Sequence, residues 1–210
     1  RPKDKIIHAK PVEFDKIALP YDYYSDFDIK NRHIYIESSR GCPFTCEFCL
    51  SSIDSSMRYL PIDVFLNEID KLWNRGARNY KFIDRTFNLK ISYAKAILDY
   101  FLAKDEDYFL HFEVIPDNFP PELRELLKKF KAGSLQLEVG IQTLNLDVAK
   151  QINRNLKMEK IKDNLAFLSS ETKAHMHIDL IVGLPAETIE SFSQNLNLLY
   201  TLSSGEIQIG

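Results

Sequence analysis

The chain has 210 residues, and 27 Lys and Arg against 30 Asp and Glu give it a formal net charge of −3. Hydrophobic residues make up 45% and charged residues 27%, a globular composition that excludes disordered and collagen-like chains. Because the charge is nearly balanced and no basic block occurs, we expect neither nucleic acid nor a membrane surface as a partner. No apolar run approaches the roughly 20 residues of a membrane-spanning helix, and no signal peptide opens the chain.

The cysteines are few and clustered. The chain has three of them, Cys42, Cys46 and Cys49, within eight positions. An odd number cannot pair completely into disulfides, and the close spacing is typical of a metal or cluster site in a reducing compartment. We therefore expect a cytoplasmic location.

The first part of the chain, residues 1–33, shows no sustained periodicity and contains three prolines and a tyrosine-rich stretch. We interpret it as an extended lead-in or interdomain linker that packs through its aromatic side chains. The chain starts at Arg1 rather than Met, and its last residues have a strand-like pattern with nothing after them. We therefore expect a fragment in which residues 1–33 connect a preceding domain to a core at 34–210.

From Ile34 onward, short apolar runs alternate with segments whose apolar residues recur at helical spacing. The expected strands cover 34–37, 79–84, 109–115, 135–142, 176–182 and 206–209. The expected helices begin at Pro61 and after Pro121, and otherwise cover 94–102, 144–151, 157–169 and 189–199. This alternation predicts a parallel sheet with right-handed crossovers.

Three of the expected strands, 109–115, 135–142 and 176–182, carry one apolar and one polar face. A parallel sheet with helices on both sides would be apolar on both faces. We therefore expect an α/β fold in which the sheet curls into a partial, six-stranded barrel, with helices outside and a polar lumen that holds a polar ligand. The alternative is that these polar groups satisfy one another around buried water.

The cysteines belong to the stretch Gly41-Cys42-Pro43-Phe44-Thr45-Cys46-Glu47-Phe48-Cys49, directly after the first strand. Three thiolates leave a four-coordinate site one ligand short. A structural zinc site would need a fourth Cys or His, and none of the five His lies nearby in sequence. Thiolates also suit iron–sulfur clusters, which we favour over zinc.

This CxxxCxxC pattern, with an aromatic residue before the last Cys, resembles the radical S-adenosylmethionine (SAM) superfamily. The resemblance covers about residues 34–210 and implies a partial (βα)6 barrel of the TIM-like, radical SAM type. It also implies a four-iron, four-sulfur cluster on Cys42, Cys46 and Cys49, with the methionyl amine and carboxylate of SAM on the fourth iron. The stretch Glu37-Ser38-Ser39-Arg40-Gly41-Cys42-Pro43 resembles the branch that carries a cobalamin-binding domain before the barrel. Cobalamin, held by such a missing domain, is then a further implied cofactor.

Other positions resemble cofactor-binding residues of this superfamily, in particular of the oxygen-independent coproporphyrinogen oxidases. The resemblance implies that Phe48 packs beside the adenine, with loop packing as the alternative. It implies that Glu113 contacts SAM, that Gln142 binds the ribose and that Asp179 lies near the nucleoside. Arg154 resembles the arginine that pairs with the methionyl carboxylate, with a solvated salt bridge at a helix end as the alternative. At Gly183 and Ile181 the resemblance places the backbone against the adenine.

One stretch departs from the family pattern. Many members have a glycine-rich turn after the second strand that binds the methionyl amine, and this chain has Phe82-Ile83-Asp84-Arg85-Thr86-Phe87 there. Asp84 either takes the amine by charge or forms a buried structural pair with Arg85.

The resemblance implies an enzyme that cleaves SAM reductively to a 5′-deoxyadenosyl radical, which acts on an unidentified small-molecule substrate. An electron donor such as a flavodoxin or ferredoxin is then a partner, and cobalamin would redirect the reaction to radical methylation. Two alternatives stay open. One is a zinc-stabilised binding domain without catalysis, and the other is a methylthiotransferase acting on tRNA or a ribosomal protein, which would need additional cluster cysteines.

Overall fold

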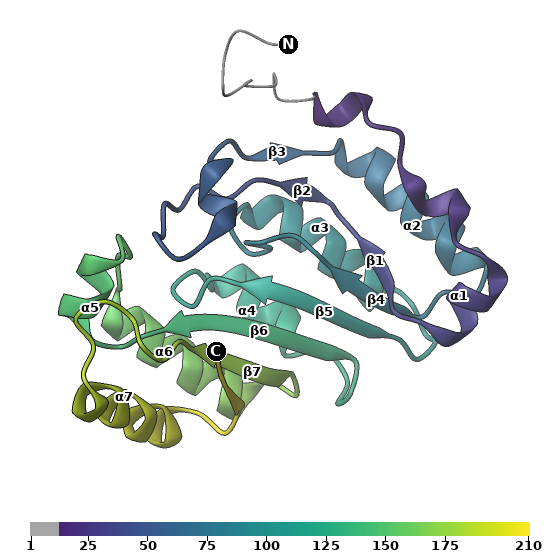
Figure 1. The fold of residues 1–210 in the computed structure, drawn as a ribbon. Helices are drawn as coiled ribbons and strands as arrows, with labels where there is room; N and C mark the ends of the chain where they lie inside the picture. Colours follow the sequence, from purple (N-terminus) through teal and green to yellow (C-terminus); the bar gives the residue numbers. More distant parts are fainter. Residues whose placement is uncertain (1–12) are drawn as a thin grey trace, which may run out of the picture.

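The computed structural model describes residues 13–210, and its centre is one parallel sheet of six strands. The strands lie side by side in the order β1-β4-β5-β6-β7-β8 and curve as a partial barrel (Figure 1). Their bounds are Ile34–Ile36 for β1, Asn79–Phe82 for β4, Phe109–Val114 for β5, Leu135–Gln142 for β6, His175–Leu180 for β7 and Glu206–Ile209 for β8. The predicted α/β fold and all six predicted strands are confirmed, with ends that differ by no more than two residues.

Helices connect the strands, as the apolar spacing predicts. They are α2 (Ile62–Asn74), α3 (Ile91–Leu102), α4 (Pro121–Leu127), α5 (Leu146–Gln151), α6 (Met158–Glu171) and α7 (Ile189–Leu202). Helix α2 follows Pro61 and ends before Gly76, whose φ of +100° a residue with a side chain adopts only with strain.

A second, two-stranded antiparallel sheet pairs β2 (Ser39–Arg40) with β3 (Arg58–Tyr59). The sequence did not predict it, because strands of two residues are too short to show a period. The pairing joins the two ends of the loop that holds the cysteines.

The described part of the lead-in, residues 13–33, is helical rather than extended. It contains two 3-10 helices, η1 (Phe14–Lys16) and η2 (Pro20–Tyr23), and helix α1 (Asp26–Asn31), which Ser25 caps in a reciprocal box with Asp28. Three of its apolar side chains are buried in the same core as the sheet, namely Phe14, Tyr21 and Ile29. The expected packing by aromatics therefore occurs, but from short helices, and residues 1–12 lie outside the described part.

The main core lies between the helices and one face of the sheet. Along β6 the side chains alternate strictly between buried and partly exposed, with Leu135, Leu137, Val139 and Ile141 on the buried side. An aromatic cluster fills the centre of this layer, where the rings of Phe87 and Phe112 stack with centroids 3.7 Å apart. The opposite face of β6 is left to polar side chains.

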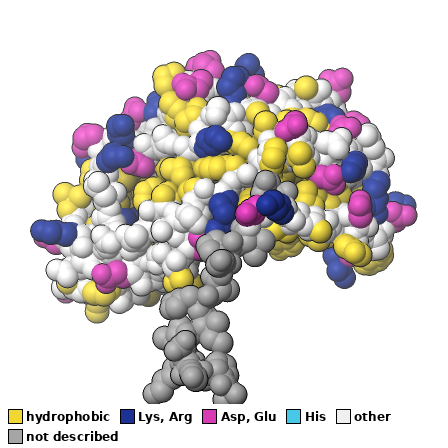
Figure 2. Space-filling view, turned by 90° about the horizontal axis from the view of Figure 1, so that it is seen from above, with side chains coloured by type: hydrophobic (Ala, Val, Ile, Leu, Met, Phe, Trp, Pro, Cys, Tyr) yellow, Lys and Arg dark blue, Asp and Glu magenta, His cyan; other side chains and the backbone are white. Residues whose placement is uncertain are grey.

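The surface carries charges of both signs. On the face seen in Figure 2, Lys and Arg side chains lie interspersed with Asp and Glu around hydrophobic side chains. Within residues 13–210, no helix combines the length and the apolar character that crossing a bilayer requires.

Candidate cofactor site

Polar side chains cover the lumen face of the sheet in rows that follow the strand register. The first row contains Lys81, His111, Gln136 and His175. The second contains Glu113, Glu138, His177 and Glu206, and the third, nearer the carboxyl ends, contains Gly140, Asp179 and Gln208. Because successive side chains alternate across a strand, the residues between these rows face the apolar core.

The cysteine loop, residues 41–57, lies at the carboxyl end of this sheet. It starts with Gly41 at a φ of +97°, and a Cβ atom there would lie 2.1 Å from the Ser56 carbonyl oxygen, so only glycine fits. The backbone N–H of Cys42 donates to the Asp54 carbonyl at 3.0 Å. These contacts hold the two sides of the loop together.

The three thiols have the composition of a cluster site. Cys46 is buried, Cys42 and Cys49 are partly exposed, and burial raises the pKa of the Cys42 thiol. Such a thiol becomes a stable thiolate when a metal centre binds it.

The spacing of the thiols also bears on which centre they fit. Two thiolates on one zinc ion lie at most about 4.6 Å apart, because each zinc–sulfur bond is about 2.3 Å long. Within residues 13–210, one group of three His, Cys, Asp or Glu side chains has all its ligand atoms within 4.8 Å of one another, and it contains no cysteine. The three thiols are therefore not gathered around one point as the ligands of a single zinc ion are.

Arg154 joins the cysteine loop to the lumen. It follows α5 through Asn153, whose left-handed backbone, with a φ of +55°, turns the chain back at the helix end. Its guanidinium donates through Nη2 to the Gly140 carbonyl, and Nη1 lies 3.7 Å from the Cys46 sulfur. Its Nε atom is buried and has no partner, so it is available to an anionic ligand.

One cavity of about 430 Å³ contacts most of the predicted site residues. Cys42, Cys46 and Cys49 line it together with Phe48, Glu113, Gln142, Arg154 and Asp179. Gly183 does not line this cavity and lies exposed in a turn, with a φ of +81°. Among residues 13–210, five buried side-chain polar atoms lack a partner, and three of them belong to cavity-lining residues, namely Thr86, His111 and Arg154. The cavity therefore has unused hydrogen-bonding capacity for a polar ligand.

Gln142 reaches the cavity from an irregular end of β6. Its φ is +70°, a left-handed conformation that is rare outside glycine, and the register to β7 shifts between Gly140 and Gln142. The Gln142 carbonyl still accepts the N–H of Ile181 at 3.0 Å, so the shift redirects the side chain without separating the strands. Backbone strain of this kind concentrates at binding sites.

A charged network on the lumen face was not predicted as part of the site. Glu138 Oε1 lies 2.8 Å from His111 Nε2 and 3.1 Å from His177 Nδ1. Burial opposes ionisation of Glu138, but the hydrogen bonds from His111 and Gln136 outweigh it and hold the pKa of the carboxyl below its usual range. The side-chain alternation had placed all three residues on polar faces, and only the strand register brings them together.

Both signs of charge occur around the cavity. Burial, with the negative charges of Glu138 and Glu113, raises the pKa of Asp179 to about 6. Arg85 Nη1 lies 3.3 Å from each carboxylate oxygen of Glu113. With Arg154 on the side of the cysteines, this arrangement suits a ligand that itself carries both charges.

The structure corrects both interpretations of Asp84. Its side chain is almost fully buried and does not line the cavity, and Arg85 pairs with Glu113 instead. The Asp84 carboxylate accepts the hydroxyls of Ser38 and Ser39, each at 2.6 Å, and the N–H of Ser38 at 3.0 Å. Asp84 therefore joins the end of β4 to the segment that leads into the cysteine loop.

We expect Asp84→Ala to lower the free energy of unfolding by about 1–3 kcal/mol, because it leaves two hydroxyls and one N–H buried without partners. Urea denaturation followed by circular dichroism measures this loss, with Asp105→Ala, at an exposed aspartate, as the control. Unchanged stability together with weakened SAM binding would restore the amine-binding role of Asp84.

Comparisons with known proteins agree on a family. The family model described as the Radical SAM superfamily matches residues 36–199. Among curated proteins, the chain is similar to the ribosomal protein uS12 methylthiotransferase RimO of a Nitratiruptor species, with 22% identity over 205 residues that cover 93% of this chain and 47% of the relative. It is also similar to the tRNA-2-methylthio-N(6)-dimethylallyladenosine synthase of Fusobacterium nucleatum, with 23% identity over 80% of this chain and 41% of the relative. The chain thus spans less than half the length of these two relatives.

Solved structures with the same fold include enzymes of two kinds. The radical SAM methyltransferase TsrM from Kitasatospora setae, with cobalamin and a four-iron, four-sulfur cluster bound, superposes with a TM-score of 0.73 at 18% identity, over 88% of this chain and 38% of that one. Coproporphyrinogen III oxidase (HemN) from Escherichia coli superposes with a TM-score of 0.63 at 21% identity, over 84% of this chain and 43% of that one. At these identities the likeness establishes the partial barrel fold.

Proposed function

Because this chain belongs to the Radical SAM superfamily, we propose that it is the core of an enzyme that binds a four-iron, four-sulfur cluster and SAM and acts on a substrate not yet identified. The observation that carries this proposal is that three thiols and a partly buried arginine open onto one polar cavity inside a partial barrel. When bound, the cluster and SAM supply an electron and a 5′-deoxyadenosyl radical that abstracts hydrogen from the substrate.

In this proposal the cysteine loop holds the cluster through Cys42, Cys46 and Cys49. Arg154 performs two tasks. Its Nη1 contacts the Cys46 sulfur and so positions the cysteine loop, and its unpaired Nε and adjacent N–H groups bind the methionyl carboxylate. Because Nη2 is anchored on the Gly140 carbonyl, the guanidinium does not need to reorganise when SAM binds.

The remaining cavity residues orient the rest of SAM. Glu113 and Asp179 present carboxylates from β5 and β7, and Gln142 offers an amide from the end of β6 to the ribose. Phe48, an exposed residue that lines the cavity, supplies an aromatic surface for the adenine. Gly183 does not line the cavity, so we assign its backbone a smaller part in binding the adenine than the side chain of Phe48.

We further propose that the protein works in a reducing cytoplasmic compartment, where a flavodoxin or ferredoxin supplies the electron. The substrate in this proposal is a small molecule. The mixed charge of the cavity and the net charge of −3 support a small zwitterionic ligand more than a nucleic acid. We also propose that a domain preceding residue 34 binds cobalamin. The likeness of the fold to TsrM supports this proposal.

A methylthiotransferase is the second candidate, favoured by the curated relatives RimO and the tRNA-modifying synthase. All three cysteines of this chain lie in the one motif, so a second cluster would need ligands outside residues 1–210. Iron analysis of the full-length protein distinguishes the two, since one cluster gives about four irons per chain and a second cluster raises that number.

Anaerobic reconstitution tests the proposal. Protein incubated with ferrous iron, sulfide and a thiol should acquire about four irons and four sulfides per chain and a brown colour. Addition of SAM and dithionite should then release 5′-deoxyadenosine, measured by chromatography. A protein that stays colourless and takes up no iron would overturn the cluster, and a brown protein that never cleaves SAM would overturn the activity.

A further inference from the structure

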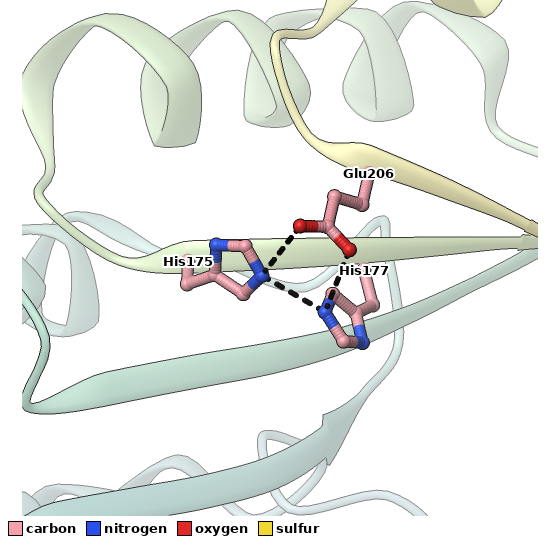
Figure 3. Close-up of side chains that lie close together, drawn as sticks. All are labelled: His175, His177 and Glu206. Carbon is pink, nitrogen blue, oxygen red and sulfur yellow. Dashed lines mark hydrogen bonds and ion pairs between the residues drawn. The ribbon is translucent and has the colours of Figure 1, made fainter.

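A second group of metal-ligating side chains lies at the other end of the strands from the cysteine loop. Its members are His175 and Glu206, the first residues of β7 and β8, and His177. Their ligand atoms all lie within 4.8 Å of one another. Figure 3 shows the three side chains pointing toward a common point beside β7 and β8.

The backbone fixes this arrangement. His175 and His177 are two residues apart on one strand, so their side chains share the lumen face. Glu206 is the register partner of His177 on the neighbouring parallel strand, and this ladder brings its carboxylate beside both imidazoles. The group therefore depends on regular strand pairing and not on a loop conformation.

The distances between the donor atoms match a small tetrahedral ion. His175 Nε2 lies 2.9 Å from His177 Nε2 and 3.4 Å from Glu206 Oε1, and His177 Nε2 lies 3.5 Å from Glu206 Oε2. Neighbouring ligands on tetrahedral zinc, with bonds of about 2.0–2.1 Å, lie about 3.3 Å apart. The observed separations lie close to this value on either side, with a different oxygen of the Glu206 carboxylate turned toward each imidazole.

A carboxylate also lies behind His177, on the other side of its ring from the group. Glu138 Oε1 lies 3.1 Å from His177 Nδ1 and can accept a hydrogen bond from it, a contact that leaves Nε2 as the ligand atom. The side-chain amide nitrogens of Gln136 and Gln208 also contact this Nδ1, at 3.2 Å and 2.6 Å. A carboxylate behind a histidine ligand is the usual outer partner of a metal-bound imidazole.

We propose that His175, His177 and Glu206 bind one zinc-type divalent ion at the amino end of the lumen, separate from the cysteine site. Two imidazoles and a carboxylate are a zinc ligand set, and the partial exposure of His175 and Glu206 leaves a fourth position to water. The ion joins β8, at the edge of the described sheet, to β7 near their starts. It should therefore stabilise the pairing on which the position of Gln208 depends.

The test uses protein whose cluster has been reconstituted, so that the cysteines are occupied. After equilibration with zinc sulfate and gel filtration, we expect about one zinc per chain by elemental analysis, and X-ray absorption should show only nitrogen and oxygen ligands. His175→Ala and Glu206→Gln should each weaken zinc binding by at least about 100-fold, since removal of an outer-shell partner alone costs 10–100-fold. His33→Ala, at an exposed histidine outside the group, should bind zinc as the wild type does.

A thermal scan gives an independent readout. Zinc should raise the unfolding temperature of the wild-type protein and of His33→Ala, and should leave that of His175→Ala unchanged. Zinc content that is equal in all variants, sulfur ligands in the absorption spectrum, or no zinc in the wild type would each overturn the site. Iron and sulfide are counted in the same samples, so failure of the zinc site can be distinguished from failure of the cluster.

Discussion

Replacing any one of Cys42, Cys46 or Cys49 by Ala should abolish assembly of the iron–sulfur cluster. The loop offers three thiols and the chain has no fourth cysteine, so no other thiol can substitute for the lost ligand. Each variant should therefore contain less than about a tenth of the wild-type iron and sulfide after anaerobic reconstitution, and it should lack the visible absorption of the cluster.

The loop itself supplies the control for this experiment. Ser55→Ala changes an exposed residue of the same loop and should keep the full iron content. Circular dichroism of the three cysteine variants should remain that of the wild type, because the core forms from the strands and helices and not from the loop. Full iron in any one cysteine variant would remove that residue from the ligand set.

The second large effect is expected at Arg154. Arg154→Ala should weaken SAM binding to the reconstituted protein by at least about 100-fold, because it leaves the carboxylate of SAM without its partly buried cationic partner. Arg154→Lys keeps the charge but loses the planar fork, so its affinity should lie between those of Arg154→Ala and the wild type. Isothermal titration under anaerobic conditions measures all three affinities.

Iron content separates the two contacts of Arg154. We expect both variants to retain the cluster, since the three thiols remain. Lys150→Ala removes an exposed cation from α5, outside the cavity, and should bind SAM normally. If iron and SAM binding fall together in Arg154→Ala, the arginine serves mainly to hold the cysteine loop. If neither changes, it is a solvated cation at a helix end.

The polar lining of the lumen could be predicted from sequence, because it follows from the alternation of side chains along each strand. The alternation of Gln136, Glu138 and Gly140 with apolar residues fixes which side chains share a face, and the number of strand–helix units fixes the partial barrel. The cysteine motif identified the centre of the site in the same way, from spacing within one short stretch.

What could not be predicted depends on register or on burial. The zinc-type group contains Glu206, whose distance to His177 is known only once β7 and β8 are aligned. Asp84 was misinterpreted because its partners, Ser38 and Ser39, lie on another strand segment that only the folded sheet brings near. Helix α1 is different, because the pair Ser25 and Asp28 is a capping signal that the sequence does contain.

The clamped ends of the cysteine loop have a consequence for the entropy of cluster binding. A free segment loses conformational entropy when its ligands gather on one centre, and this cost grows with the length of chain to be closed. Here the pairing of β2 with β3, and the hydrogen bond from Cys42 to Asp54, close the loop before any metal arrives. A second tether, from the Asn153 side chain to the Thr45 hydroxyl at 2.6 Å, holds the loop to the end of α5. Most of the loop is therefore ordered when the chain folds. Little of the binding free energy of the cluster is then spent on ordering the loop, and the cluster should be held more tightly.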